Sequence, residues 1–365
     1  MGKPLEQELL LGCGGIQALR KLGIEASTYH CNEGHAAFTG LERLKEYITE
    51  ERLTFAEAIE VVRASSLFRL IHLYLQDMMP FRKYAAYLHL SLCRSAENLL
   101  GTAVGIRKIN VADPNEKFSM SFLAANLAQE MNGVSWLHGE VSKEIFKGMW
   151  PGYMAEELHI SYVTNGVHYP TWAAPEWKKI EESLFGEDFK NHHYDKKCFE
   201  QIYTVPDAVV YEVRTKLRKR LIDHVKELLK DEVAASYFTP RQVIQIRETL
   251  RDDILTIGFA RRFATYKRAH LLFRNLERLD EIVNNPKHPV QFIFAGKAHP
   301  ADKAGQDLIK RIVEVSKYPQ FLGKIIFLPN YDMDLAKKLV QGVDVWMNTP
   351  TRPQEASGTS GEKVL

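Results

Sequence analysis

The chain has 365 residues, of which 45% are hydrophobic and 26% are charged, so it can bury a large core and is long enough for two domains. Its 48 lysine and arginine residues nearly balance its 46 aspartate and glutamate residues, which argues against nucleic acid or an anionic membrane surface as a partner. No run of residues is long and apolar enough to cross a bilayer. The four cysteines lack metal-ligand spacing and a dense disulfide pattern, as is typical of a cytoplasmic protein.

The first part of the chain is predicted to contain helices mixed with short strands. Apolar residues recur at helical spacing within Leu41–Arg63, and Ser119–Gln129 is a second predicted helix, whose small residues allow close packing. Ala208–Asp231 is a long and highly charged helix candidate. We interpret it as a solvated face or a connector between domains rather than as a binding surface.

From residue 254 onward, short buried strands alternate with helices. The predicted strands are Ile254–Ala260, Val290–Ala295, Ile325–Leu328 and Val343–Met347. The predicted helices between them are Lys267–Val283, Ala304–Ser316 and Met333–Val340. This alternation predicts a doubly wound parallel sheet. We place the domain boundary within residues 240–253, which gives an N-terminal domain over 1–245 and the first part of a C-terminal domain over 246–365.

Polar groups follow each of these predicted strands. They are Arg261 and Arg262, then Gly296 and Lys297, then Tyr331, and finally Glu355. Because the carboxyl ends of parallel strands share one edge of a sheet, we expect these groups to lie along that edge. Arg262 and Lys267 flank a strand-to-helix turn and could converge on one anion. The alternative is that they belong, with Arg261 and Arg268, to a surface charge run.

The last eleven residues, Glu355–Leu365 (EASGTSGEKVL), place small and hydroxyl residues ahead of one lysine. A loop of this kind before a helix offers free backbone N–H groups to a phosphate. A lysine a few residues further on can form a Schiff base with pyridoxal phosphate. The alternative interpretation is an ordinary helix start.

Several segments together resemble one known family, the α-glucan (glycogen, starch and maltodextrin) phosphorylases. The C-terminal segment is one of them. The others are Gly258–Arg268 (GFARRFATYKR), Cys31–His35 (CNEGH), Asn132–His138 (NGVSWLH), Thr164–His168 (TNGVH) and Phe294–Pro300 (FAGKAHP). Their order is similar to that of the shorter bacterial and archaeal branch of the family.

The resemblance implies a hexosyltransferase. It would transfer the terminal glucosyl unit of an α-1,4-glucan or maltodextrin to inorganic phosphate and give α-glucose 1-phosphate with retention. The implied fold is α/β and GT-B-like, with two Rossmann-type domains facing a cleft, both incomplete here. By comparison with the family, an N-terminal portion is missing and the chain stops just after the lysine. We therefore expect an internal fragment of a longer polypeptide that is inactive by itself; a homo-oligomer is left open.

The resemblance also implies roles for the phosphate-binding and cofactor-binding residues. Lys363 matches the Schiff-base lysine of pyridoxal 5'-phosphate, whose phosphate group, with a second pKa of roughly 6, would exchange a proton with inorganic phosphate. Arg262 and Lys267 match the residues that bind the substrate phosphate. Arg261, which stands where many relatives have Lys, is implied to contact the cofactor phosphate. The residues implied to lie near that phosphate are Tyr331, Gly358 and Thr359.

The implied sugar contacts are Glu355, Ser357, Asn165 and Tyr266, of which Tyr266 would also contact phosphate. His35 matches a histidine near the catalytic cleft, although a structural role is an equal alternative. His138, His168 and the pair His192 and His193 lack the spacing of metal ligands, so we expect no metal site.

One segment, residues 69–105, departs from the family. The family's Thr-His-Thr-Pro stretch has no counterpart in Phe68–Phe81, and the resemblance resumes at Asn110–Phe118. Reading the codons one base out of register can restore a family-like sequence there. We therefore hypothesise a frameshift, against the alternative of real divergence. His72 is not a substitute for the missing histidine.

Two other functions remain open. A nucleotide-sugar glycosyltransferase of the glycogen or starch synthase type would share the fold, but a lysine after Ser-Gly-Thr-Ser argues against it. A non-catalytic glucan-binding fragment would fit the missing ends and the anomalous segment. Nucleotide dependence without pyridoxal would favour the first, and glucan binding without turnover would favour the second.

Overall fold

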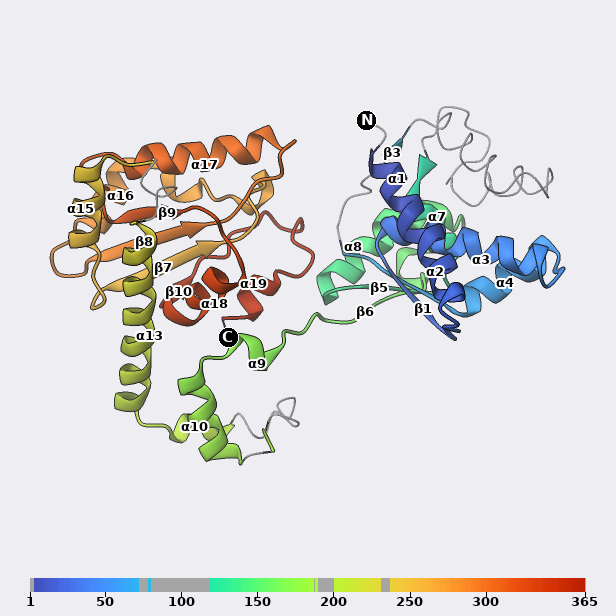
Figure 1. Ribbon diagram of the computed structural model, residues 1–365, viewed down its shortest axis with the longest axis horizontal. Helices are drawn as coiled ribbons and strands as arrows, with labels where there is room; N and C mark the ends of the chain where they lie inside the picture. The colour runs from blue at the N-terminus through green and yellow to red at the C-terminus, as the bar shows by residue number, and fades with distance from the viewer. Residues whose placement is uncertain are drawn as a thin grey trace. The chain divides into compact units, whose positions relative to one another are not determined.

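The computed structural model describes residues 3–71, 78–79, 118–186, 188–189, 200–230 and 237–364. Residues 72–77 and 80–105 of the anomalous segment, and His192 and His193, lie outside the described residues. The chain forms two compact units (Figure 1). Unit 1 comprises Met1–Asn165 and Arg352–Ser357, and unit 2 comprises Gly166–Thr351 and Gly358–Leu365. The predicted domain boundary near residue 245 lies inside unit 2, and the assignment of domains to 1–245 and 246–365 stays a prediction.

Unit 1 is built on a four-stranded parallel sheet with the order β1-β2-β5-β6. The strands are β1 (Tyr29–Asn32), β2 (Ser66–Arg69), β5 (Glu130–Gly133) and β6 (Ile160–Tyr162). Among the described residues of unit 1, the helices are α1 (Lys3–Leu9), α2 (Gly15–Lys21), α3 (Phe38–Thr49), α4 (Phe55–Ala64), α7 (Met120–Asn126) and α8 (Trp136–Phe146). Short strands β3 (Met78–Met79) and β4 (Phe118–Ser119) pair antiparallel. Short helical turns lie at Leu10–Gly14, Gly34–Ala36, Lys147–Met149 and Ala155–Glu157.

The predicted helical stretch Leu41–Arg63 forms two helices, α3 and α4, rather than one. The chain turns between them at Arg52, which has a positive φ of 58°. Thr54 then starts α4 with a capping box, in which its hydroxyl accepts a hydrogen bond from the N–H of Glu57 and the Glu57 carboxylate accepts one from the N–H of Thr54. The apolar residues of both helices still reach one core, together with Phe68 of β2 and Leu123 of α7.

Unit 2 is built on a second four-stranded parallel sheet, with the order β10-β7-β8-β9. The strands are β7 (Leu255–Ala260), β8 (Val290–Ala295), β9 (Ile325–Leu328) and β10 (Val345–Trp346). In the described part of unit 2, the helices are α9 (Tyr169–Trp172), α10 (Pro175–Phe185), α13 (Asp207–Leu228), α15 (Pro240–Thr249), α16 (Leu276–Val283), α17 (Lys303–Ser316), α18 (Met333–Gly342) and α19 (Thr359–Glu362). Short helical turns lie at Gln201–Thr204, Thr265–Lys267 and Leu271–Arg274. The prediction of a mixed α/β protein with parallel sheets is confirmed.

Apolar side chains cover both faces of the second sheet. Alternate residues along a strand point to opposite faces, so Phe259, Phe294 and Phe327 join the core under α16 and α17. Their neighbours Ala260, Ala295 and Leu328 join the core under α13, α15 and α18. Burial on both faces explains why these strands are continuous apolar runs in the sequence.

The predicted helix Lys267–Val283 is wrong in its first half. The chain instead makes two short turns before α16 begins at Leu276. Arg268 has a left-handed conformation with φ of 50°, which a continuing helix does not allow. Asn275 then caps α16, because its side-chain oxygen accepts a hydrogen bond from the N–H of Arg278 at 2.9 Å.

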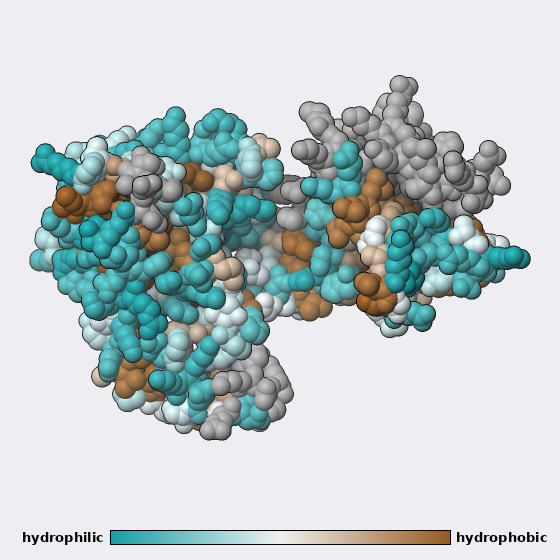
Figure 2. Space-filling view, in the orientation of Figure 1, coloured by the Kyte–Doolittle hydropathy of each residue, from teal (hydrophilic) through white to brown (hydrophobic). Residues whose placement is uncertain are grey.

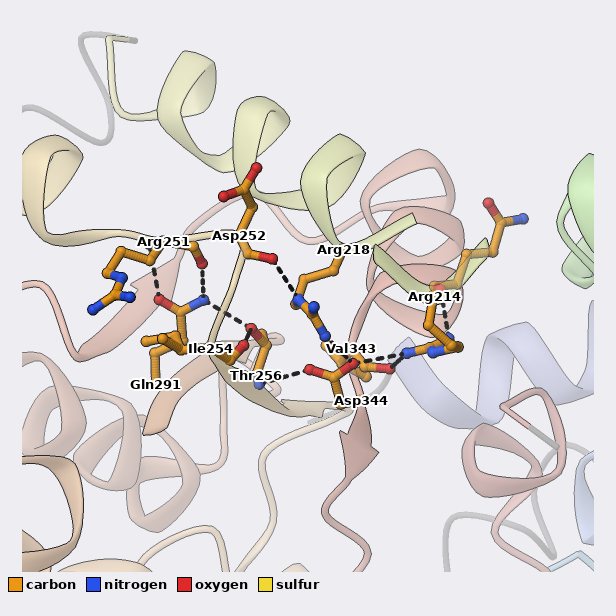
Figure 3. Close-up of polar contacts among 10 residues, drawn as sticks. Arg214, Arg218, Arg251, Asp252, Ile254, Thr256, Gln291, Val343 and Asp344 are labelled. Atoms are coloured by element: carbon orange, nitrogen blue, oxygen red, sulfur yellow. Dashed lines mark hydrogen bonds and ion pairs between the residues drawn. The ribbon is translucent and has the colours of Figure 1, made fainter. Parts of the chain in front are cut away.

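A polar cluster fastens α13 to the amino-terminal edge of the second sheet (Figure 3). Arg218 of α13 donates to Asp344 Oδ1 at 2.7 Å and to the carbonyl of Asp252 at 2.6 Å. The other carboxylate oxygen of Asp344 accepts from the backbone N–H of Thr256 at 2.9 Å. Arg214, one turn earlier, donates to the carbonyl of Gln341 at 3.1 Å. The predicted helix Ala208–Asp231, observed as α13, is therefore an integral part of unit 2.

The C-terminal half of α13 is amphipathic. Leu217, Leu221, Ile222 and Val225 are buried, whereas its charged residues are mostly exposed, and Figure 2 shows hydrophilic residues over the side of α13 turned to the viewer. Gly342 of α18 lets the two helices approach closely, because a Cβ there would lie 2.5 Å from that of Leu221. Within the described residues, no helix is long and apolar enough to cross a membrane.

Candidate functional site

The carboxyl-terminal edge of the second sheet holds most of the predicted phosphate and cofactor residues. The chain leaves β7 and β8 side by side, since the N–H of Phe263 donates to the carbonyl of Lys297 at 2.9 Å. Gly296 allows this approach: its φ is 148°, and a Cβ there would lie 2.1 Å from the carbonyl oxygen of Arg261. Arg261 and Arg262 therefore follow β7 and Lys297 follows its neighbour β8, as predicted.

Along the chain, β8 and β9 follow on one side of β7, whereas β10 returns to its other side. Open α/β sheets bind ligands at such a switch point, here between β7 and β10. Arg261, at the end of β7, is buried and donates a hydrogen bond to the side-chain oxygen of Asn348, just after β10. Tyr331, after β9, reaches the same edge and donates to the carbonyl of Ala260 at 3.5 Å. Burial raises the pKa of Tyr331, and the nearby charge of Arg261 partly opposes that shift.

Lys267 and Tyr266 lie in a short turn that is fastened to the segment after β10. The N–H of Thr351 donates to the carbonyl of Tyr266 at 2.7 Å, and the guanidinium of Arg268 donates to the carbonyl of Thr349 at 2.7 Å. Lys267 is 6% exposed, and its Nζ lies 4.9 Å from the ring centroid of Tyr266. Arg262 is exposed. An accessible cation, Arg262, thus precedes the turn and a buried cation, Lys267, ends it.

Lys363 is held against an aromatic face. Its Nζ lies 4.1 Å from the ring centroid of Trp172, which is 8% exposed in α9. Burial lowers the pKa of Lys363, and the carboxylate of Glu362 partly offsets this shift. A lysine with a lowered pKa has more neutral amine, the nucleophilic form, at a given pH.

The loop before Lys363 fits a phosphorylated cofactor. Gly358 has a left-handed backbone, with φ of 83° and ψ of 42°, which only glycine adopts freely. Thr359 and Ser360 begin α19, and the hydroxyl oxygen of Ser360 is buried with no hydrogen-bond partner among the described residues. The buried indole nitrogen of Trp346 also lacks an acceptor there. These groups, with the lysine, fit pyridoxal phosphate.

The predicted sugar residue Asn165 lies in unit 1, next to a residue of the anomalous segment. Arg69, at the end of β2, donates a hydrogen bond from its guanidinium to the side-chain oxygen of Asn165. Glu33, at the end of β1, has a φ of 58°, and its carboxylate accepts a hydrogen bond from the N–H of Ile71. The side-chain oxygen of Asn165, which was expected to contact a sugar, thus accepts a hydrogen bond from a charged side chain.

Of the other predicted sugar residues, Tyr266 lies in unit 2, whereas Glu355, Ser357 and His35 belong to unit 1. Glu355 and Ser357 are half-buried, and the intervening Ala356 accepts a hydrogen bond through its carbonyl from the Ser135 hydroxyl. His35 is exposed, with its Nδ1 3.8 Å from Glu8 Oε1. His138 is buried and its Nδ1 accepts from the N–H of Val134 at 3.1 Å, which fits the structural role expected. Among the described residues, no group of metal-ligating side chains occurs.

Sequence reasoning did not single out four residues that lie beside the candidate site residues: Trp172, Trp346, Asn348 and Arg69. Asn348 follows directly on the predicted strand Val343–Met347, so the strand-end rule could have found it. No local signal marks Trp172 as a neighbour of Lys363, because they are distant in the chain. Arg69 lies in the segment 69–105, for which the sequence analysis found no resemblance to the family's motifs.

Comparison with known proteins identifies similar chains. The family model of the carbohydrate phosphorylases matches residues 17–365. The chain is 38% identical to a glycogen phosphorylase of Mycobacterium tuberculosis, over 98% of this chain and 42% of that protein. It is also 38% identical to a maltodextrin phosphorylase of Thermococcus litoralis, over 99% of this chain and 42% of that protein, and to a glycogen phosphorylase of Aquifex aeolicus, over 99% and 51%. The chain thus spans about half the length of these relatives.

Proposed function

The chain belongs to the carbohydrate phosphorylase family, and from this premise we propose that it is part of an α-1,4-glucan phosphorylase. The reaction would transfer a terminal glucosyl unit from a glucan or maltodextrin to inorganic phosphate, giving α-glucose 1-phosphate with retention. We also propose a GT-B architecture with two Rossmann-type domains, and a cytoplasmic location. The names of the relatives, glycogen and maltodextrin phosphorylase, support the substrate class.

The observation that carries this proposal is the setting of Lys363. Its Nζ lies on the face of Trp172, and burial lowers its pKa. A glycine in the left-handed conformation and the hydroxyls of Thr359 and Ser360 precede it. A lysine that served only the solvated surface would need neither the aromatic face nor the depressed pKa.

In unit 2, we assign Lys363 to hold pyridoxal phosphate, and Gly358, Thr359, Arg261 and Tyr331 to hold its phosphate end. When bound, the cofactor supplies a phosphate group that can exchange a proton near neutral pH. Trp172 would cover the amine and exclude water from it. The buried position of Arg261 strengthens its attraction for an anion, because the local dielectric constant is lower than that of water.

We assign Arg262 and Lys267 to the substrate phosphate. The guanidinium can grip two phosphate oxygens, and the ammonium adds a compact charge. Tyr266, whose ring lies beside the Lys267 ammonium, would limit where that charge can move. Holding the phosphate in one orientation is the contribution of these residues to the rate.

In unit 1, Asn165, Glu355 and Ser357 are assigned to glucose hydroxyls, and His35 to the neighbourhood of the sugar. Amide and carboxylate groups suit this role, because each hydroxyl both donates and accepts hydrogen bonds. The hydrogen bond from Arg69 to Asn165 competes with this assignment.

Reductive trapping tests the cofactor assignment. The protein is loaded with pyridoxal 5'-phosphate, reduced with borohydride and mapped by peptide mass spectrometry. We expect a pyridoxyl group on Lys363 in the wild type and in Lys310→Met, a control at an exposed lysine of α17, and none at this peptide in Lys363→Met. Scattered labelling of surface lysines, or no labelling, would contradict the proposal. Binding of a nucleotide sugar without pyridoxal would favour the synthase-type alternative.

A further inference from the structure

The indole N–H of Trp346 is a buried hydrogen-bond donor without an acceptor among the described residues. The residue ends β10 and packs both against the core under α13, α15 and α18 and against a small cluster in unit 2 whose buried members are Trp172, Ala336 and Val340. Its indole Nε1 is inaccessible to solvent, and no described residue accepts a hydrogen bond from it. A buried N–H without an acceptor costs free energy, whereas phenylalanine could fill a similar space without that cost.

Trp346 and Lys363 both adjoin the cluster that contains Trp172. Trp172 belongs to the same cluster and carries the Nζ of Lys363 over its ring. Tyr331 and Val364, the residue after the lysine, also pack against this cluster. The two tryptophans, the tyrosine and the lysine come from four separate segments of the chain, and the fold brings them to one place.

We propose that Trp346 is a cofactor-binding residue, whose indole N–H donates a hydrogen bond to an oxygen on the ring of the pyridoxal group. The inference rests on the proposed function, since it requires that Lys363 carry pyridoxal phosphate. Trp346 lies outside the motifs quoted in the sequence analysis, although the family match includes it.

The aromatic character of the cluster favours the ring over the phosphate as the acceptor. The cluster against which Trp346 packs contains Trp172, Ala336 and Val340, and Val167 packs against it as well; such planar or apolar side chains suit a flat heteroaromatic ring. The phosphate end is matched by other groups, namely the Ser360 hydroxyl and the backbone N–H groups of the loop after Gly358. The chemistry of the two ends thus separates, and Trp346 lies with the ring end.

The test compares Trp346→Phe with Trp177→Phe in the full chain. The first variant keeps an aromatic side chain and removes the N–H, whereas the second changes a tryptophan of α10 outside the cluster. Binding is measured by absorbance titration with pyridoxal 5'-phosphate and with pyridoxal, which lacks the phosphate. We expect Trp346→Phe to weaken both ligands by about three- to tenfold, the range of one hydrogen bond, and Trp177→Phe to leave both unchanged.

Thermal unfolding without ligand separates a packing role from a binding role. Equal ligand affinities in Trp346→Phe and the wild type would overturn the inference and leave the proposed function in place. A loss of affinity confined to pyridoxal 5'-phosphate would have the same meaning, because it would assign the N–H to the phosphate end. A lower melting temperature with unchanged affinity would give Trp346 a packing role only and overturn it as well. If the wild type bound neither ligand, the proposed function itself would fail.

Discussion

The Nζ of Lys363 and the ring of Trp172 are 4.1 Å apart, although the two residues lie far apart in the chain. The contact gives the lysine a partner that favours its cation, while burial favours its neutral form and dominates the shift in its pKa. The amine is thereby held in one place and made more nucleophilic at a given pH, which are the two properties that attachment of an aldehyde requires.

The first prediction concerns the neighbouring carboxylate. Glu362 raises the pKa of Lys363 and so opposes the effect of burial. Glu362→Gln should lower that pKa further, increase the fraction of neutral amine, and shift the pH profile for reaction with pyridoxal 5'-phosphate to lower pH. Stopped-flow absorbance over a pH series measures the profile. Glu277→Gln, an exposed position in α16, serves as the control, and a shift to higher pH in Glu362→Gln would contradict the argument.

The second prediction concerns the clamp between α13 and the sheet. Asp344 is 15% exposed and accepts hydrogen bonds from Arg218 and from the backbone of Thr256. Asp344→Asn removes the charge and leaves the guanidinium of Arg218, 9% exposed, without its counterion. We expect a loss of roughly 3 kcal/mol in the free energy of unfolding, measured by urea denaturation.

The control for that experiment is Asp307→Asn, which breaks an exposed pair with Lys303 in α17. Exposed ion pairs contribute little, so its free energy of unfolding should change by less than about 1 kcal/mol. Equal effects of the two substitutions would show that the clamp is no stronger than a surface pair.

The third prediction concerns Arg69 and Asn165. If Asn165 binds a glucose hydroxyl, its hydrogen bond with Arg69 must be broken first. Arg69→Ala should therefore tighten maltodextrin binding by about three- to tenfold, the range of one hydrogen bond, as measured by isothermal titration calorimetry. Lys21→Ala, at an exposed position of unit 1, controls for the change in net charge.

The double variant Arg69→Ala, Asn165→Ala distinguishes the mechanism. Its affinity should fall back to or below that of the wild type, because the amide freed in the single variant is now missing. If the double variant kept the gain, Arg69 would act on the sugar by some route other than Asn165.

Much of the second sheet could be predicted from local patterns. Val290–Ala295 and Ile325–Leu328 are β8 and β9 with the predicted bounds, because a strand buried on both faces must be apolar at every position. The last strand is shorter than predicted: β10 covers only Val345–Trp346. Asp344 lies just before this strand. Its backbone N–H donates to the carbonyl of Thr256, but the N–H of Thr256 donates to the Asp344 carboxylate instead of to a backbone carbonyl.

Helix boundaries were harder to predict, because apolar periodicity continues across breaks in the chain. The stretch Leu41–Arg63 keeps one apolar spacing through two helices, which are separated by a turn with a positive φ at Arg52 and by the capping box of Thr54. Similarly, Lys267–Val283 has helical spacing, but the hydrogen bonds of Arg268 to the carbonyls of Thr349 and Pro350 hold its first residues in a different turn. Those partners lie more than eighty positions away.

The sequence by itself determined the family, the parallel α/β class, and the residues that follow the strands at the candidate phosphate and cofactor edge. It did so because motifs and strand runs are local: each depends on neighbours within a few residues. Only the tertiary structure decided that Trp172 and Trp346 share a cluster near Lys363, that Arg69 contacts Asn165, and that Asp344 binds α13. These contacts join distant segments through packing and hydrogen bonding, and nothing in the local pattern of either partner specifies the other.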